Sequence, residues 1–92
     1  MNIKEFTESI ITYYLENGGE VNPDITIHIF QFIENNKELL SEYNALKSHY
    51  KEVNPTIGQT IRAHFDFRND KTIVVGDKCS LLTSYTRFHK KD

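Results

Sequence analysis

The chain has 92 residues, the size of one small domain, so a multidomain enzyme is excluded. Its single cysteine excludes an internal disulfide and a cysteine-based zinc site, which suits a reducing cytosol. No apolar run approaches the roughly 18 to 20 residues that cross a membrane. We therefore expect one domain over residues 1–92, located in the cytoplasm and not associated with a membrane.

The charge is divided along the chain. Residues 1–46 carry two basic and eight acidic side chains, a net charge of −6, whereas residues 47–92 carry nine basic and five acidic side chains, a net charge of +4. Such asymmetry indicates that the second half faces an anion. The pI near 6.1 is well below the value of about 9 that is typical of dedicated nucleic-acid binders.

The first helix is predicted by apolar residues at helical spacing. They are Ile3, Phe6, Ile10 and either Tyr13 or Tyr14, which cannot both face inward, and two glycines follow at residues 18–19. Asn-Pro pairs at residues 22–23 and 54–55 both predict a helix start, with asparagine as the N-cap and proline at the first helical position.

A heptad spacing continues from the first of these pairs. Its members alternate at intervals of three and four: Ile29, Phe32, Asn36, Leu39, Tyr43, Leu46 and Tyr50. This seam predicts one long amphipathic helix, or two helices with a break at Asn35-Asn36, where Asn36 caps the restart. A short strand is the alternative for residues 25–33, because residues 25–29 alternate and are rich in β-branched side chains. The seam also allows a homodimer in which Asn36 sets the register.

The second half predicts a helix followed by a hairpin. We expect a helix over 56–67 whose inward face holds Ile57, Ile61, His64 and Phe65. Residues 68–71 are predicted as a turn, 72–75 as a strand, 76–78 as a second turn and 81–88 as the second strand, with Tyr85 and Arg87 on one face of it. The fold class is therefore α+β and mostly α, with three or four helices before a C-terminal β-hairpin.

This order of elements resembles a winged helix-turn-helix domain. Residues 51–54 would be the turn, 56–67 the recognition helix and 71–88 the wing. The segments Asn54–Ile61 and Ser80–Arg87 also look like the C-terminal portion of small proteins and domains of phages and mobile elements. The resemblance covers residues 36–89, and residues 1–35 form an N-terminal helical part that it does not reach.

The resemblance implies a set of DNA-contacting residues. Base reading would fall on Thr56, Gln59, Thr60, Arg62 and Ala63, and wing or phosphate contacts on Arg68, Lys71, Lys78 and Arg87. Asp66 and Asp70 depart from this pattern, because each adds repulsion toward phosphate.

Catalytic and metal-binding motifs are not found in the sequence. The four histidines lack metal-ligand spacing, Cys79 has no signature of a catalytic nucleophile and is interpreted as a surface thiol, and the glycines form no phosphate-binding loop. We expect no catalytic residue, no metal, no cofactor and no enzyme activity.

Two functions from different classes remain. The first is a small non-enzymatic winged-helix protein that binds nucleic acid, such as a regulator from a phage or mobile element. The alternative is a phage or mobile-element inhibitor that binds a host defence nuclease, such as a CRISPR effector, through an acidic helical face. That face would hold Glu34, Glu38 and Glu42, with Tyr85 as an interface anchor. Mutation of Arg62 or Arg87 would weaken the first function, and charge reversal of the glutamates the second.

Overall fold

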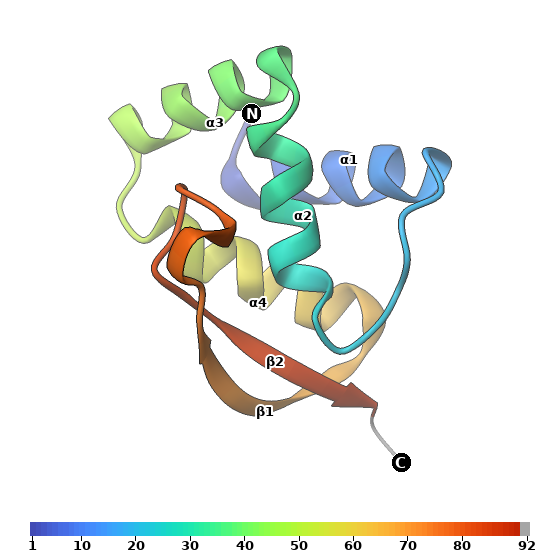
Figure 1. The fold of residues 1–92 in the computed structure, drawn as a ribbon. Coiled ribbons are helices and arrows are strands. Elements are labelled where there is room, and N and C mark those ends of the chain that lie inside the picture. Colours follow the sequence, from blue (N-terminus) through green and yellow to red (C-terminus); the bar gives the residue numbers. More distant parts are fainter. Residues whose placement is uncertain (91–92) are drawn as a thin grey trace.

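The computed structural model describes residues 1–90 and contains, within them, four helices followed by a two-stranded hairpin (Figure 1). The elements are α1 (Ile3–Glu16), α2 (Ile25–Glu34), α3 (Lys37–His49), α4 (Val53–Phe65), β1 (Phe67–Val74), a 3-10 turn (Gly76–Lys78) and β2 (Ser84–Lys90). The predicted fold class, α+β and mostly α with a C-terminal hairpin, is confirmed.

Helix α1 follows its sequence signals closely. The Asn2 side chain accepts the Glu5 amide at 2.8 Å, and the Glu5 carboxylate accepts the Asn2 amide in return, which forms a capping box. Gly18 has a φ of 80° just after the helix, a conformation that glycine adopts without a steric penalty. Tyr14 is buried and Tyr13 is 44% exposed, so only one of the two tyrosines faces inward, as predicted.

Residues 25–34 form helix α2, so the alternative of a strand is wrong. The alternating pattern misleads because α2 is buried around most of its circumference: Ile25, Thr26, Ile27, Ile29, Phe30 and Ile33 are all buried. The Asn22 side chain accepts the Asp24 amide at 2.9 Å, and the regular helix begins at Ile25. The first Asn-Pro pair therefore lies in the turn that precedes the helix rather than within it.

The heptad seam is divided between two helices, with the break at Asn36. The Asn36 side chain accepts the amides of Glu38 and Leu39, both at 3.1 Å, and so caps α3. Tyr43 and Leu46 are buried in the core of the chain itself, and Tyr50 is 45% exposed rather than buried as the seam implied. The seam is therefore used in the core of the chain and Asn36 serves as a helix cap, so the predicted homodimer has no support from the seam and stays a prediction.

Helix α4 begins at Val53, before the predicted cap at Asn54. Glu52 precedes it in the left-handed conformation with a φ of 59°, and Pro55 lies in the first turn, where no intrahelical donor is needed. The side chain of Asn54 makes long-range contacts instead: its amide donates to the Leu81 carbonyl at 2.8 Å, and its carbonyl oxygen accepts the Tyr43 hydroxyl. The prediction of Asn54 as the N-cap is wrong.

The hairpin differs from the prediction at both strands. Residues 68–71 belong to β1 rather than to a turn, because they pair with 87–89 of β2. Residues 81–83 lie in the loop before β2, where the Leu81 carbonyl accepts from Asn54. Asp66, with a φ of 54°, makes the sharp turn from α4 into β1, one residue before the predicted helix end.

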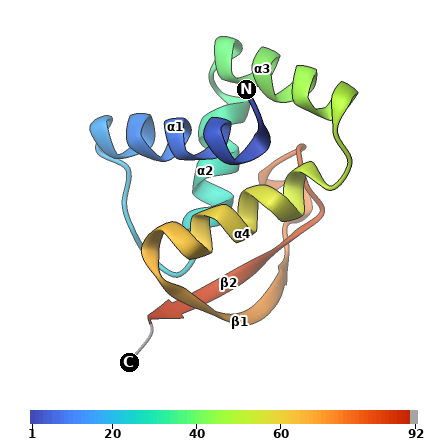
Figure 2. The ribbon, with the colours of Figure 1, turned by 180° about the vertical axis from the view of Figure 1, so that it is seen from behind.

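Helix α4 lies between α1 and the hairpin, as Figure 2 shows from behind. It packs mainly against α1, whereas α3 packs mainly against α2. Ile57 and Ile61 of α4 meet Phe6 and Ile10 in one buried cluster that also takes in Phe88 of β2. His64 is exposed, so its predicted place on the inward face of the helix is wrong. The hairpin is thus fixed against α4 on one side and leaves much of its other side to solvent.

Candidate nucleic-acid interface

A β-bulge at Asp70 decides which side chains share a face of the hairpin. The register pairs Arg68 with His89 and Lys71 with Arg87, and the shift between them falls between Asn69 and Lys71. In a regular strand residues 68 and 71 would point to opposite faces, but the extra residue at the bulge brings both to the same face. We call this set of four, Arg68, Lys71, Arg87 and His89, the cationic face.

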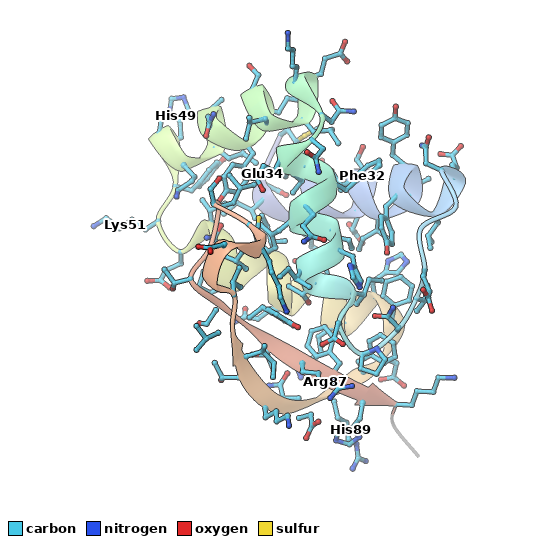
Figure 3. The ribbon with its side chains drawn as sticks, viewed as in Figure 1. Phe32, Glu34, His49, Lys51, Arg87 and His89 are labelled. Atoms are coloured by element: carbon cyan, nitrogen blue, oxygen red, sulfur yellow. The ribbon has the colours of Figure 1, made fainter. Side chains whose placement is uncertain are left out.

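The cationic face places Lys71 directly opposite Arg87 and Arg68 directly opposite His89. The like-charged Lys71–Arg87 pair destabilises the hairpin, because Cβ atoms of opposed residues lie only about 5 Å apart. Within residues 1–90, Arg68 and Lys71 have no carboxylate at ion-pair distance, and Arg87 is the only member with one, a contact of 3.4 Å from its Nε to Asp24 Oδ1. The face therefore has unmatched positive charge. Figure 3 shows Arg87 and His89 together on β2, away from Glu34.

Asp24 anchors β2 to the start of α2. Its Oδ1 accepts the Tyr85 hydroxyl at 2.8 Å and also meets Arg87, and the Phe88 amide donates to the Pro23 carbonyl at 2.9 Å. Burial and the bond to Asp24 raise the pKa of Tyr85 to about 12. Tyr85 and Arg87 share a face as predicted. The phenol of Tyr85 is used within the fold, which reduces its availability as an interface anchor.

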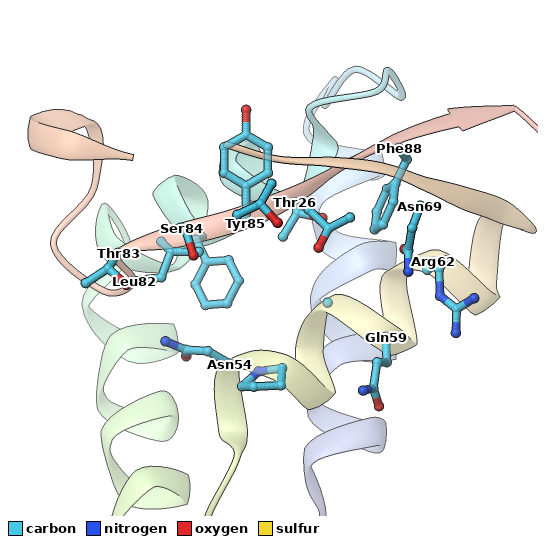
Figure 4. A pocket seen from close by; sticks show the side chains of 15 residues that line it. Thr26, Asn54, Gln59, Arg62, Asn69, Leu82, Thr83, Ser84, Tyr85 and Phe88 are labelled. Atoms are coloured by element: carbon cyan, nitrogen blue, oxygen red, sulfur yellow. The ribbon is translucent and has the colours of Figure 1, made fainter. Parts of the chain in front are cut away.

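The opposite face of the hairpin forms a groove with α4. It has a volume of about 480 Å³ and is lined by fifteen side chains, which Figure 4 displays. From α4 come Asn54, Pro55, Gly58, Gln59 and Arg62, and from the hairpin come Asn69, Thr72, Ser84, Thr86 and Phe88, among others. We call it the α4–hairpin groove. Its walls are mostly amide and hydroxyl groups above an apolar floor to which Phe30 and Phe88 contribute.

The residues predicted to read DNA on α4 are used in different ways. Thr56 and Thr60 turn their hydroxyls back to the carbonyls of Glu52 and Thr56, at 2.7 and 2.8 Å. Gln59 and Arg62 line the groove, and neither side chain forms a hydrogen bond or ion pair within residues 1–90. The structure thus brings Gln59 and Arg62 together and leaves the two threonines as part of the helix.

Lys78 lies apart from the other predicted cations. It is exposed in the 3-10 turn of the connection between the strands, and its carbonyl accepts the Gln31 side chain at 3.1 Å. Of the predicted wing contacts, only Arg68, Lys71 and Arg87 share one face.

The predicted acidic row is interrupted. The Glu34 carboxylate accepts the amide and hydroxyl of Ser80, and these bonds hold the pKa of Glu34 below its ordinary value. Glu38 and Glu42 are exposed on α3, beyond the break at Asn36. The three glutamates therefore do not form one continuous helical face.

Cys79 is buried rather than on the surface, so the interpretation of a surface thiol is wrong. It is 4% exposed, and burial raises the pKa of its thiol. Within residues 1–90, no group of three or more His, Cys, Asp or Glu side chains is arranged to hold a metal ion.

Sequence reasoning missed several residues of these two surfaces. Asn69 and Thr72 line the groove and His89 completes the cationic face, whereas the sequence predicts a turn for residues 68–71. The pairs Arg68-Asn69 and Lys71-Thr72 flank Asp70, and in each pair the first side chain lies on the cationic face and the second in the groove. This arrangement can be recognised only once the bulge is known. No signal in the sequence marks that bulge.

Comparison of the chain with protein-family models, with curated proteins and with solved structures finds no match. Across residues 1–90, none of the helices has the length and apolar character needed to cross a membrane.

Proposed function

We propose that this protein binds nucleic acid through the cationic face of its hairpin. The observation that supports the proposal is the bulged register, which gathers Arg68, Lys71, Arg87 and His89 in two directly opposed pairs. A phosphate backbone offers the negative charge that would offset this arrangement, and phosphate contacts by arginine and lysine supply most of the affinity of nucleic-acid binders.

The resemblance to winged helix-turn-helix domains supports the same proposal. In that frame the hairpin acts as the wing and holds phosphates, while α4 supplies the residues that meet bases. Gln59 and Arg62 are suited to this role, since their side chains have no partners within residues 1–90. The protein acts without catalysis, as a small regulator would, and its place of action is the cytoplasm.

A salt titration of binding tests the proposal. Fluorescence anisotropy with labelled duplex DNA and with single-stranded oligonucleotides would be measured between low and physiological salt. Each lost phosphate contact lowers the slope of log affinity against log salt by about 0.7 to 0.9. The double variant Arg68→Ala/Lys71→Ala should therefore lower the slope by about 1.4 to 1.8.

The matched control removes two lysines of the same formal charge far from the hairpin. Lys4 on α1 and Lys37 at the start of α3 are both exposed, and the start of α3 lies at the opposite end of the molecule from strands β1 and β2 (Figure 1). The variant Lys4→Ala/Lys37→Ala should keep the slope of the unmodified protein. Absence of binding at low salt would refute the proposal, and a basic protein partner for the exposed glutamates of α3 would then be sought.

A further inference from the structure

The α4–hairpin groove contains polar side chains that the fold does not use. Gln59, Asn69, Thr72, Ser84 and Thr86 form no side-chain hydrogen bond within residues 1–90. Thr26, only 3% exposed, also lines the groove, and its hydroxyl has no hydrogen-bond partner in the same residues. Gln59, Asn69, Thr72 and Ser84 are exposed and Thr86 is half-buried, so these groups are free to bond water or a ligand. A buried hydroxyl such as that of Thr26 is normally paired, and an unpaired one beside polar groups that converge on a groove is typical of a site that receives a ligand.

Arg62 adds one unmatched charge to this set. It is half-buried in the groove, and within residues 1–90 no carboxylate lies at ion-pair distance from its guanidinium. Asn69 points from the hairpin toward the side of the groove where Arg62 lies (Figure 4). The site therefore combines a single cation with neutral groups that both donate and accept hydrogen bonds, above an apolar floor. A ligand that fits it carries a negative charge, several hydrogen-bonding edges and an apolar plane.

The groove and the cationic face share strand β1. Asn69 and Thr72 point into the groove, whereas their neighbours Arg68 and Lys71 lie on the cationic face. A nucleic-acid strand that contacts both Arg68 or Lys71 and the groove must therefore pass around the free edge of β1. A volume of about 480 Å³ is in the range that accommodates a small organic ligand, and it cannot enclose a base pair within its duplex.

From these observations we propose that the α4–hairpin groove holds one unpaired base of a single-stranded nucleic acid, with Arg62 and Asn69 contacting the base edge and the adjoining phosphate. This inference rests on the proposed function and specifies its ligand. Proteins that recognise single strands generally do so through bases that are splayed out, because the edges and faces of such bases are free. An acidic peptide is the competing occupant, but a strand of nucleic acid is favoured because its successive phosphates would also reach the cationic face on the other side of the hairpin.

The test compares two arginines on opposite faces of the hairpin region. Arg62→Gln removes the charge of the groove, and Arg68→Gln makes the same chemical change on the cationic face. Asn69→Ala is a second groove variant, at an exposed position where the fold tolerates it. Affinity would be measured by anisotropy for three labelled probes of equal length: a single strand, a fully paired duplex, and a duplex with an unpaired internal loop.

We expect the single strand and the looped duplex to bind more tightly than the paired duplex. Arg62→Gln should weaken both of the former about tenfold, since a charge-assisted hydrogen bond contributes about one factor of ten or more, and should weaken the paired duplex by a clearly smaller factor. Asn69→Ala should act in the same direction by a smaller factor. Arg68→Gln should weaken all three probes alike.

The outcomes separate the inference from the proposed function. Suppose that Arg68→Gln weakens the binding of every probe, while Arg62→Gln either weakens none or weakens all three equally. The groove inference is then wrong and the proposed function stands. If no probe binds, the proposed function fails and the inference with it. Tighter binding of an acidic peptide than of the single strand, lost on Arg62→Gln, would also overturn the inference and identify a peptide site. Circular dichroism melting of each variant confirms that it is folded.

Discussion

Asn54 joins three parts of the fold, and replacing it should cost more than the loss of a helix cap. Its amide donates to the Leu81 carbonyl at 2.8 Å, and its carbonyl oxygen accepts from Tyr43, so α3, α4 and the loop before β2 meet at one side chain. Each bond contributes about 1 kcal/mol, and leaving a partly buried partner unsatisfied adds a further penalty of about 1 kcal/mol. We expect Asn54→Ala to lower the free energy of unfolding by about 2 to 3 kcal/mol.

Asn54→Asp distinguishes this bridge from a cap. Aspartate caps a helix as well as asparagine does, so a cap alone predicts almost no change. In the bridge, the carboxylate cannot donate to the Leu81 carbonyl and instead places an anionic oxygen against it. The variant should therefore lose about 2 kcal/mol or more at neutral pH.

Urea denaturation followed by circular dichroism measures both variants. A lower midpoint with an unchanged slope would indicate a change in stability rather than in the unfolded state. Tyr43→Phe, alone and combined with Asn54→Ala, gives a double-mutant cycle in which we expect a coupling energy of about 1 kcal/mol between the two side chains. Wild-type stability of Asn54→Asp at pH 7 would refute the reasoning and restore Asn54 as a cap.

Three further predictions follow from other contacts. Hydrogen bonds from Ser80 hold the pKa of Glu34 below its ordinary value in the folded protein, so ionised Glu34 stabilises the fold above the pKa it has in the unfolded chain. That stabilisation is lost as the pH falls through the pKa of Glu34 in the folded protein. Glu34→Gln should therefore reduce the loss of stability below about pH 4, measured by urea denaturation at a series of pH values. Gly19→Ala should destabilise the protein by about 1 to 3 kcal/mol, because the added Cβ would meet the Tyr14 ring at 2.5 Å. Gly58→Ala, at a helical position with open space around it, should stabilise the protein by about 0.5 to 1 kcal/mol. Thermal melts of the two variants measure both effects. Cys79 should react slowly with a thiol reagent in the native protein and rapidly in urea, since burial both shields the thiol and raises its pKa; equal rates would contradict its buried position.

Local signals in the sequence predicted what is locally determined. The spacing of Ile3, Phe6 and Ile10 was sufficient for α1. Asn36 gave the correct position for a break between α2 and α3, because a cap acts on amides two and three residues away, but the seam left one long helix as the other possibility. Helix α2 was ambiguous, since a helix buried on most sides has no polar face from which to read a period.

Features that depend on distant partners could not be predicted. Asn54 has the sequence context of a cap, but its contacts are to residues 43 and 81, which only the tertiary fold brings close. Residues 68–71 contain the polar and charged types that are common in turns, and they form a strand because β2 is aligned beside them. The cationic face was predicted residue by residue for Arg68, Lys71 and Arg87, whereas their shared orientation depends on the bulge at Asp70.

The attachment of β2 to the turn before α2 has a consequence for how the chain folds. Tyr85 and Asp24 are 61 residues apart, and the Phe88–Pro23 bond beside them spans a similar separation. Closing so long a loop costs entropy before any contact compensates for it, and a topology dominated by such contacts folds slowly. During synthesis from the N-terminus, all four helices emerge before β2. Phe67 and the side of α4 that packs against Phe88 therefore stay uncovered until translation has passed residue 88, so the nascent chain exposes apolar surface over that interval.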